Sequence, residues 1–155
     1  MQADTGFKDP IGGSDTAVRI VIEADMMAVR HGLQDLLSCP PLLGLSEECR
    51  GTTEIVLAEA LNNVVEHAYA QYSGQIEVAI RRWQNDLLVD IADSGLPMPS
   101  AELPAGNLDV THDAQDTPEG GFGWFLIRTL SHNLNYSRVD NLNRLSFCLS
   151  TNSAA

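Results

Sequence analysis

The feature that most constrains the fold of this chain is a pair of predicted β-hairpins. Apolar and polar residues alternate over 76–80 and again over 87–91, with polar turn residues between the two runs. The same alternation occurs over 134–139 and 144–149, on either side of an Asp140-Asn141 turn. Strands joined by such short turns pair antiparallel. The chain therefore has too many adjacent strands for a parallel, doubly wound sheet.

The other periodic segments predict helices. A strand-like alternation over 18–22 is followed by helical spacing over 26–37 and by a long helical pattern over 46–72, which Gly51 could interrupt. A further helix is expected from Trp124 to about Ser131. We therefore expect an α+β fold, a two-layer sandwich with the helices on one face of a mixed, largely antiparallel sheet.

The length of 155 residues and the hydrophobic content of 44% suit a single domain with one core. Residues 1–15 are polar and aperiodic, so we expect a loose tail there, a domain over 16–150 and a short C-terminal tail over 151–155. Residues 94–119 show no sustained period. A stretch of this length inside a domain is typical of a functional lid or a disordered insert.

The charge of the chain argues against two classes of partner. The formal net charge is −12, whereas nucleic acids and anionic membranes require clustered Lys and Arg. In addition, no Lys or Arg occurs between Arg82 and Arg128. An anionic ligand bound by that interval must be held by backbone amides or by a metal ion.

Cysteine usage and the N-terminal sequence indicate the compartment. The 3 cysteines are an odd number at unrelated spacings, which argues against a disulfide framework or a zinc site. The N-terminal segment has neither a basic nor an apolar leader region, and no window approaches the roughly 18 apolar residues of a membrane span. We expect a soluble, cytoplasmic protein.

A ridge of polar side chains marks the long helical pattern. Glu59, Asn63 and His67 are spaced four residues apart, so they lie one above the other on a single helix face. A carboxylate and an amide oxygen one turn apart suit a base and a Mg²⁺ ligand, although a solvated helix face has the same pattern. We interpret His67 as a structural hydrogen-bonding residue rather than as a metal ligand with His112 or His132.

Two further motifs lie downstream. Asp93 ends an apolar strand and is followed two residues later by Gly95, so its carboxylate is able to accept a hydrogen bond from a ligand amine while the glycine allows close approach. Gly120, Gly121 and Gly123 precede a predicted helix, where free backbone amides attract phosphate. Each motif alone also fits an ordinary turn or hinge.

Together, the order and spacing of these motifs resemble one family, the anti-sigma-factor serine/threonine protein kinases of the GHKL ATPase superfamily. The similarity spans roughly residues 16–150. The motifs that carry it are Glu59-x-x-x-Asn63-x-x-x-His67-Ala68-Tyr69, Asp93-x-Gly95, Gly120-Gly121-x-Gly123-x-x-Leu126-Ile127 and Asn143-Arg144-Leu145.

The resemblance implies a Bergerat-type ATP site with defined roles. Glu59 is then the general base, Asn63 the ligand of a Mg²⁺ ion that bridges the ATP phosphates, and Asp93 the acceptor for the adenine amine. The glycines that line the nucleotide correspond to Gly95, Gly120, Gly121 and Gly123. The lid that covers it corresponds to residues 98–119. One departure is Pro97, where the wider superfamily prefers a second glycine.

The resemblance also implies a function. It is that of an anti-sigma regulatory factor and ATP-dependent kinase that phosphorylates a serine or threonine of a STAS-type anti-anti-sigma protein in partner-switching control of transcription. The implied partners are this antagonist and a sigma factor, with a second copy of the chain as a homodimer.

Two alternatives stay open at the level of sequence. Because residues 83–127 contain no Lys or Arg, the chain could bind nucleotide and control a partner by sequestration alone. A sensor-kinase-like fragment that phosphorylates histidine is the other, but the 15 residues before the predicted domain are too few for a phosphoacceptor helix pair.

Overall fold

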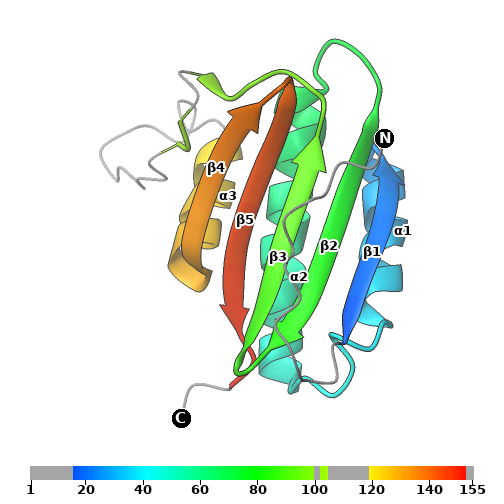
Figure 1. Ribbon diagram of the computed structural model, residues 1–155, viewed down its shortest axis with the longest axis vertical. Coiled ribbons are helices and arrows are strands. Elements are labelled where there is room, and N and C mark those ends of the chain that lie inside the picture. The colour runs from blue at the N-terminus through cyan, green and yellow to red at the C-terminus, as the bar shows by residue number, and fades with distance from the viewer. Residues whose placement is uncertain (1–15, 100–101, 105–118, 153–155) are drawn as a thin grey trace.

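The computed structural model describes residues 16–99, 102–104 and 119–152, which form a five-stranded sheet with its helices on one face (Figure 1). The strand order is β1-β2-β3-β5-β4, and each of the four pairings is antiparallel. The strands are β1 (Ala17–Glu23), β2 (Gln75–Trp83), β3 (Asp86–Asp93), β4 (His132–Val139) and β5 (Leu142–Ser150). The helices are α1 (Met26–Leu37), α2 (Glu47–Asn63), the π-helix η1 (Val64–Ala68) and α3 (Glu119–Leu130).

The two predicted hairpins are confirmed as β2–β3 and β4–β5. In the second, Asp140 and Asn141 have φ angles of 53° and 63°. Positive φ at both central residues is typical of the turn that matches the right-handed twist of paired strands, and Asp and Asn adopt it more readily than most residues. β3 and β5 pair with each other across the two hairpins, and their ends form part of the pocket described below.

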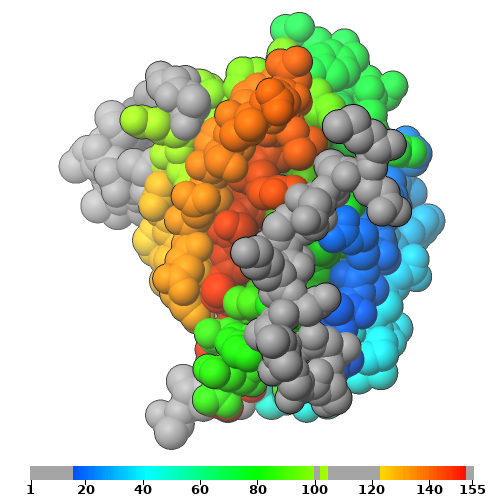
Figure 2. All heavy atoms as spheres, viewed as in Figure 1, coloured from blue at the N-terminus to red at the C-terminus, as the bar shows by residue number. Residues whose placement is uncertain are grey.

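The core lies between the sheet and the helices. Alternate residues of the central strands are buried against α2, among them Val89, Ile91 and Phe147, each at most 2% exposed. From α2, Leu57 and Leu61 are fully buried in the same cluster. Figure 2 shows the opposite face of the sheet, where β4, β5 and β1 contribute to the molecular surface. The predicted two-layer α+β fold is therefore confirmed.

Side-chain caps explain where the first two helices begin. The Asp25 carboxylate accepts a hydrogen bond from the Ala28 N–H at 2.8 Å, and the Ser46 hydroxyl accepts one from the Cys49 N–H at 3.2 Å. Such caps satisfy amide groups that have no partner within the helix.

Gly51 does not interrupt α2, which runs through it as a continuous helix. None of the helices in the described part of the chain is long and apolar enough to cross a membrane.

The end of α2 departs from the predicted continuous helix. Residues Val64–Ala68 form a π-helix, closed by a hydrogen bond from the Tyr69 N–H to the Val64 carbonyl. The Ala68 carbonyl is then able to accept a hydrogen bond from the Leu96 N–H at 2.8 Å. This bond joins the helical layer to the segment that leaves β3. Most of the predicted lid over 98–119, namely residues 100–101 and 105–118, lies outside the described residues. The predicted tail over 1–15 also lies outside them.

The contact between η1 and the β3 exit requires a glycine. A Cβ atom added at Gly95 would lie 2.4 Å from the Ala68 carbonyl oxygen, whereas one added at Gly51 would meet nothing within 4 Å. We predict that Gly95→Ala lowers the free energy of unfolding by about 1–3 kcal/mol, because backbone must move. Gly51→Ala, in the middle of α2, should raise it by about 0.5–1 kcal/mol.

Urea denaturation of the two variants and the parent chain measures both changes. Equal stability of the Gly95→Ala variant and the parent would show that the contact between η1 and the β3 exit does not require a glycine.

Candidate functional site

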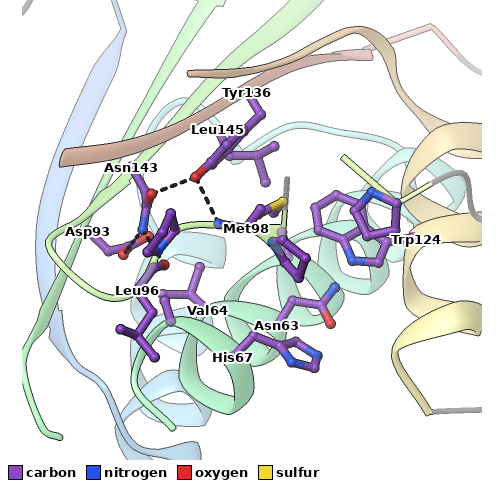
Figure 3. A pocket seen from close by; sticks show the side chains of 15 residues that line it. Asn63, Val64, His67, Asp93, Leu96, Met98, Trp124, Tyr136, Asn143 and Leu145 are labelled. Carbon is purple, nitrogen blue, oxygen red and sulfur yellow. Dashed lines mark hydrogen bonds between the residues drawn. The ribbon is translucent and has the colours of Figure 1, made fainter. Parts of the chain in front are cut away.

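A mainly apolar cavity of about 290 Å³ lies between α2 and η1 on one side and the ends of β3, β4 and β5 on the other. Its apolar walls come from elements far apart in the sequence and include Val64, Leu96, Met98, Trp124 and Leu145. Five polar side chains of the described residues also line it, namely Asn63, His67, Asp93, Tyr136 and Asn143. Figure 3 shows Asp93 and Asn143 close together at one end and Asn63 beside His67 at the other. An apolar cavity with a few convergent polar groups is the usual form of a small-molecule site.

Asp93 lies at the last position of β3 and is only 6% exposed. Its Oδ1 accepts hydrogen bonds from the Gly95 N–H and from Asn143 Nδ2, each at 2.8 Å. Its Oδ2 has no hydrogen-bond partner among the described residues. Burial raises the pKa of this carboxyl, while the hydrogen bonds from Asn143 and Gly95 and the charge of Arg138 lower it. The site therefore presents one carboxylate oxygen that is able to accept a hydrogen bond from a ligand.

Asn63 occupies the helical side of the cavity. Its side chain is 7% exposed, and within the described structure its Nδ2 is buried without a hydrogen-bond partner. An unsatisfied buried amide costs about 1–3 kcal/mol, and such groups in folded proteins call for an explanation such as a ligand. Glu59 is half-buried on the preceding turn of α2. The structure thus keeps the predicted Glu59 and Asn63 pair together on one helix face.

Helix α3 approaches this pair closely. A Cβ atom at Gly123 would lie 2.6 Å from Glu59 Oε2 and 3.4 Å from Asn63 Nδ2, so glycine allows the backbone of α3 to reach both side chains. Gly95 has a different reason to be glycine, since the space beside it is filled by the backbone of Ala68. Its predicted role in lining a nucleotide stays a prediction.

The start of α3 differs from the sequence-based expectation. The helix was expected to begin at Trp124, after the glycine motif, but it begins at Glu119 and includes Gly120, Gly121 and Gly123. The first four amides of a helix have no partner within it. The amides available to an anion here are therefore those of the first turn, which include Gly120 and Gly121, whereas Gly123 allows close helix packing.

The expected role of His67 stays a prediction. We interpreted it as a structural hydrogen-bonding residue; its side chain is exposed, lines the cavity and makes no hydrogen bond with the described residues. Trp124 is 3% exposed, packs in the hydrophobic core and also lines the cavity.

Sequence reasoning missed two residues of the site. Tyr136 and Arg138 of β4 both donate hydrogen bonds to Asn143 Oδ1, at 2.6 Å and 2.8 Å. They lie at alternate positions of a strand that was predicted, so their common face was visible in the sequence. Their contact with Asn143 was not, because it depends on how β4 pairs with β5.

Known proteins resemble this chain in the same region as the site. A family model described as "Histidine kinase-like ATPase domain" matches residues 22–149. The chain belongs to this family. Membership of the histidine kinase-like ATPase family confirms the superfamily and the fold that the motif order predicted. A domain of this family implies ATP binding.

Similar proteins include "Serine-protein kinase RsbW" of Bacillus thuringiensis (strain Al Hakam), which is 33% identical over 79 residues, 50% of this chain and 49% of that protein. The protein of the same name from Bacillus mycoides (strain KBAB4) is 29% identical over 90 residues, 57% of this chain and 56% of that protein. The matches confirm the predicted resemblance to serine kinases of the anti-sigma type. The chain spans about half the length of these relatives.

The raised pKa of Asp93 leads to a prediction about stability. Between its ordinary value of 3.8 and the raised value, the folded state binds more protons than the unfolded chain, so the free energy of unfolding falls as pH rises. Asp93→Asn removes this contribution and should make the fall shallower. Urea unfolding at a series of pH values above 3.8 measures the slope.

Asp90 provides a comparison, because burial also raises the pKa of its carboxyl and the residue lies outside the cavity lining. Asp90→Asn should likewise make the fall with pH shallower, but without affecting a ligand in the cavity. If both variants keep the slope of the parent chain, burial does not control these carboxyl groups.

Proposed function

We propose that this chain is an ATP- and Mg²⁺-dependent serine/threonine protein kinase that phosphorylates a STAS-type anti-anti-sigma protein and regulates a sigma factor by partner switching. The observation that carries the proposal lies at the two ends of one apolar cavity. Among the described residues, Asp93 Oδ2 has no hydrogen-bond partner at one end, and Asn63 Nδ2 is buried without one at the other. The family match and the similarity to RsbW kinases support it.

The two ends of the cavity suit the two ends of ATP. The adenine amine would donate to Asp93 Oδ2, while the apolar walls would cover the faces of the base. The phosphates would then extend toward Asn63 and the first turn of α3, where free amides and the helix dipole attract negative charge. Gly95, Gly120, Gly121 and Gly123 would provide the close backbone approach on this path.

The residues beside the phosphate end fit a magnesium ion. Asn63 offers a hard oxygen donor, and its side chain makes no hydrogen bond with the described residues. Asn63 would hold Mg²⁺ together with the ATP phosphates. When bound, the ion would neutralise phosphate charge during transfer.

Glu59 would act on the protein substrate. Its carboxylate would accept the proton of the serine or threonine hydroxyl, whose oxygen forms the new bond to the γ-phosphorus as the bond to the ADP oxygen breaks. None of the described residues that line the cavity is Lys or Arg. Charge neutralisation would therefore depend on the helix amides and the metal, which favours slow transfer.

That lack of a nearby cation also favours a second candidate function. The same site would hold nucleotide without transferring phosphate, and the protein would act on its partner by sequestration alone. In either case we propose a cytoplasmic protein that acts as a homodimer.

We predict that Glu59→Gln abolishes phosphoryl transfer, by at least about 100-fold, while ATP affinity stays within about twofold of the parent. Labelled Mg-ATP, the parent chain and a STAS protein encoded beside it would be incubated, and label on serine or threonine measured. ATP affinity would be measured separately by calorimetry. Tight ATP binding without label on the STAS protein would exclude the kinase and support the sequestering module.

Gly123→Ala tests the position of the base. The added Cβ would lie 2.6 Å from Glu59 Oε2, and Glu59 is long enough to rotate away, so the fold should survive while the carboxylate is displaced. A displacement of about 1 Å costs up to about 100-fold in rate, so we expect transfer to fall at least tenfold, with a smaller change in ATP affinity. Single-turnover kinetics measures it.

Gly51→Ala, at an open position of α2, is the matched control and should transfer phosphate at the parent rate. Unchanged transfer in Gly123→Ala would mean that the Glu59 carboxylate does not need its present position.

A further inference from the structure

The carboxylate of Asp93 is oriented by a buried hydrogen-bond network that the proposed kinase chemistry does not use. Asn143, which is 4% exposed, donates from Nδ2 to Asp93 Oδ1 and to the Leu96 carbonyl, each at 2.8 Å. On its other side, Asn143 Oδ1 accepts from the Tyr136 hydroxyl at 2.6 Å and from Arg138 Nη1 at 2.8 Å. Figure 3 draws the part of this network that Tyr136, Asn143 and Asp93 form.

The two donors on β4 decide which way the Asn143 amide points. An Asn side chain carries an acceptor and a donor that exchange places when the amide rotates by half a turn. Tyr136 and Arg138 both donate to the oxygen side of this amide. Rotation would place the amide NH₂ group against these two donors, and it would place the amide oxygen against the Asp93 carboxylate. Both contacts would be repulsive. The amide is therefore fixed with its N–H toward Asp93.

This fixed orientation determines which oxygen of Asp93 meets a ligand. Oδ1 already accepts from Asn143 Nδ2 and the Gly95 N–H, whereas Oδ2 has no partner among the described residues. The ligand therefore meets a single acceptor with a defined direction. Arg138 also donates to the Gly95 carbonyl, and the Met98 N–H donates to the Tyr136 oxygen, so the same residues hold the segment that follows β3.

We propose that Tyr136, Arg138 and Asn143 are positioning residues that make the site selective for a base with an exocyclic amine over a base with a carbonyl at the same place. The inference rests on the proposed ATP site. An amine donates to Asp93 Oδ2, whereas a carbonyl oxygen there would face another acceptor. ATP and ITP differ at C6 of the base, where a carbonyl replaces the amine, and at the adjoining N1, which carries a hydrogen in ITP, so their affinity ratio measures the selectivity at this edge of the base.

The test measures the affinities of Mg-ATP and Mg-ITP by calorimetry for the parent chain, Tyr136→Phe and Arg138→Met. The parent should prefer ATP by at least about tenfold, the usual worth of one hydrogen bond that has no alternative partner. Each variant removes one donor that fixes Asn143, so we expect the ATP to ITP preference to fall about three- to tenfold. The ATP to ITP preference of the double variant should fall further.

Two control variants remove comparable groups outside the network. Tyr72→Phe removes a hydroxyl that donates to the Ser94 carbonyl at 3.3 Å, and Arg50→Met removes a guanidinium that donates to the Leu37 carbonyl at 3.0 Å. Both should keep the ATP to ITP preference of the parent. They separate selectivity from the general effects of losing a hydroxyl or a charge.

Asp93→Asn supplies a second measurement that does not depend on the β4 variants. An amide at this position still accepts from Asn143 and Gly95 through its oxygen, which leaves its NH₂ group at the ligand-facing place. The acceptor becomes a donor, so the preference should invert in favour of ITP. The network predicts this inversion, because it fixes which atom of residue 93 faces the ligand.

The possible outcomes separate the inference from the function on which it rests. If the parent binds neither nucleotide, the proposed ATP site is wrong and the inference fails with it. If the parent binds ATP selectively but the β4 variants weaken ATP and ITP equally, with a lower melting temperature, the network only stabilises the fold. An unchanged preference in these variants, or no inversion in Asp93→Asn, would also overturn the inference.

Discussion

A carboxylate buried at the end of a central strand needs compensation for its charge, and in this protein the compensation of Asp93 fixes much of the site. Leaving such a group unpaired would cost several kcal/mol. Its partners come from the turn after β3, from β5 and, through Asn143, from β4. Because the carboxylate and its partners hold one another in place, the end of the sheet that faces the cavity is a rigid unit. The base end of the proposed nucleotide site is part of that unit.

The other end of the cavity belongs to the helical layer. Asn63 and Glu59 are fixed by α2, and Gly123 brings the backbone of α3 against them. The span between the two ends is therefore set by the packing of α2 on β3 rather than by any single residue. Buried aliphatic side chains on both elements, such as Leu61 and Ile91, keep that span constant. Close-packed cores resist such shifts, which suits a site that must hold a long ligand at both ends.

The parts of the structure that could be predicted from sequence are those with local causes. The hairpins follow from alternation and from turn residues such as Asp140, and α1 begins where Asp25 caps it. The start of α3 could not be predicted, because glycines are poor helix formers and tertiary packing overrides this preference. The Asn143 network joins residues up to 50 positions apart, and only strand pairing brings them together.

The candidate site was predictable to a similar extent. The spacing of Glu59 and Asn63 on one face follows from helical geometry, and the structure keeps it. The side-chain environment of His67 depends on a π-helix, so spacing alone does not determine its role. Asn143 stood in a recognised motif without an assigned role. Its role became visible only with the hydrogen-bond partners of its amide.

The π-helix η1 has a consequence for how the chain tolerates changes in length. A π-turn contains one more residue than an α-turn, and here it lies where the Ala68 carbonyl meets the Leu96 amide. Removing one residue from this turn would restore regular helical pitch, which changes the width and rise of the backbone at this point. The Ala68 carbonyl would then lose its present position opposite the Leu96 amide. Sequence changes in this segment are thus constrained in residue number as well as in residue type, although it lies within a helix.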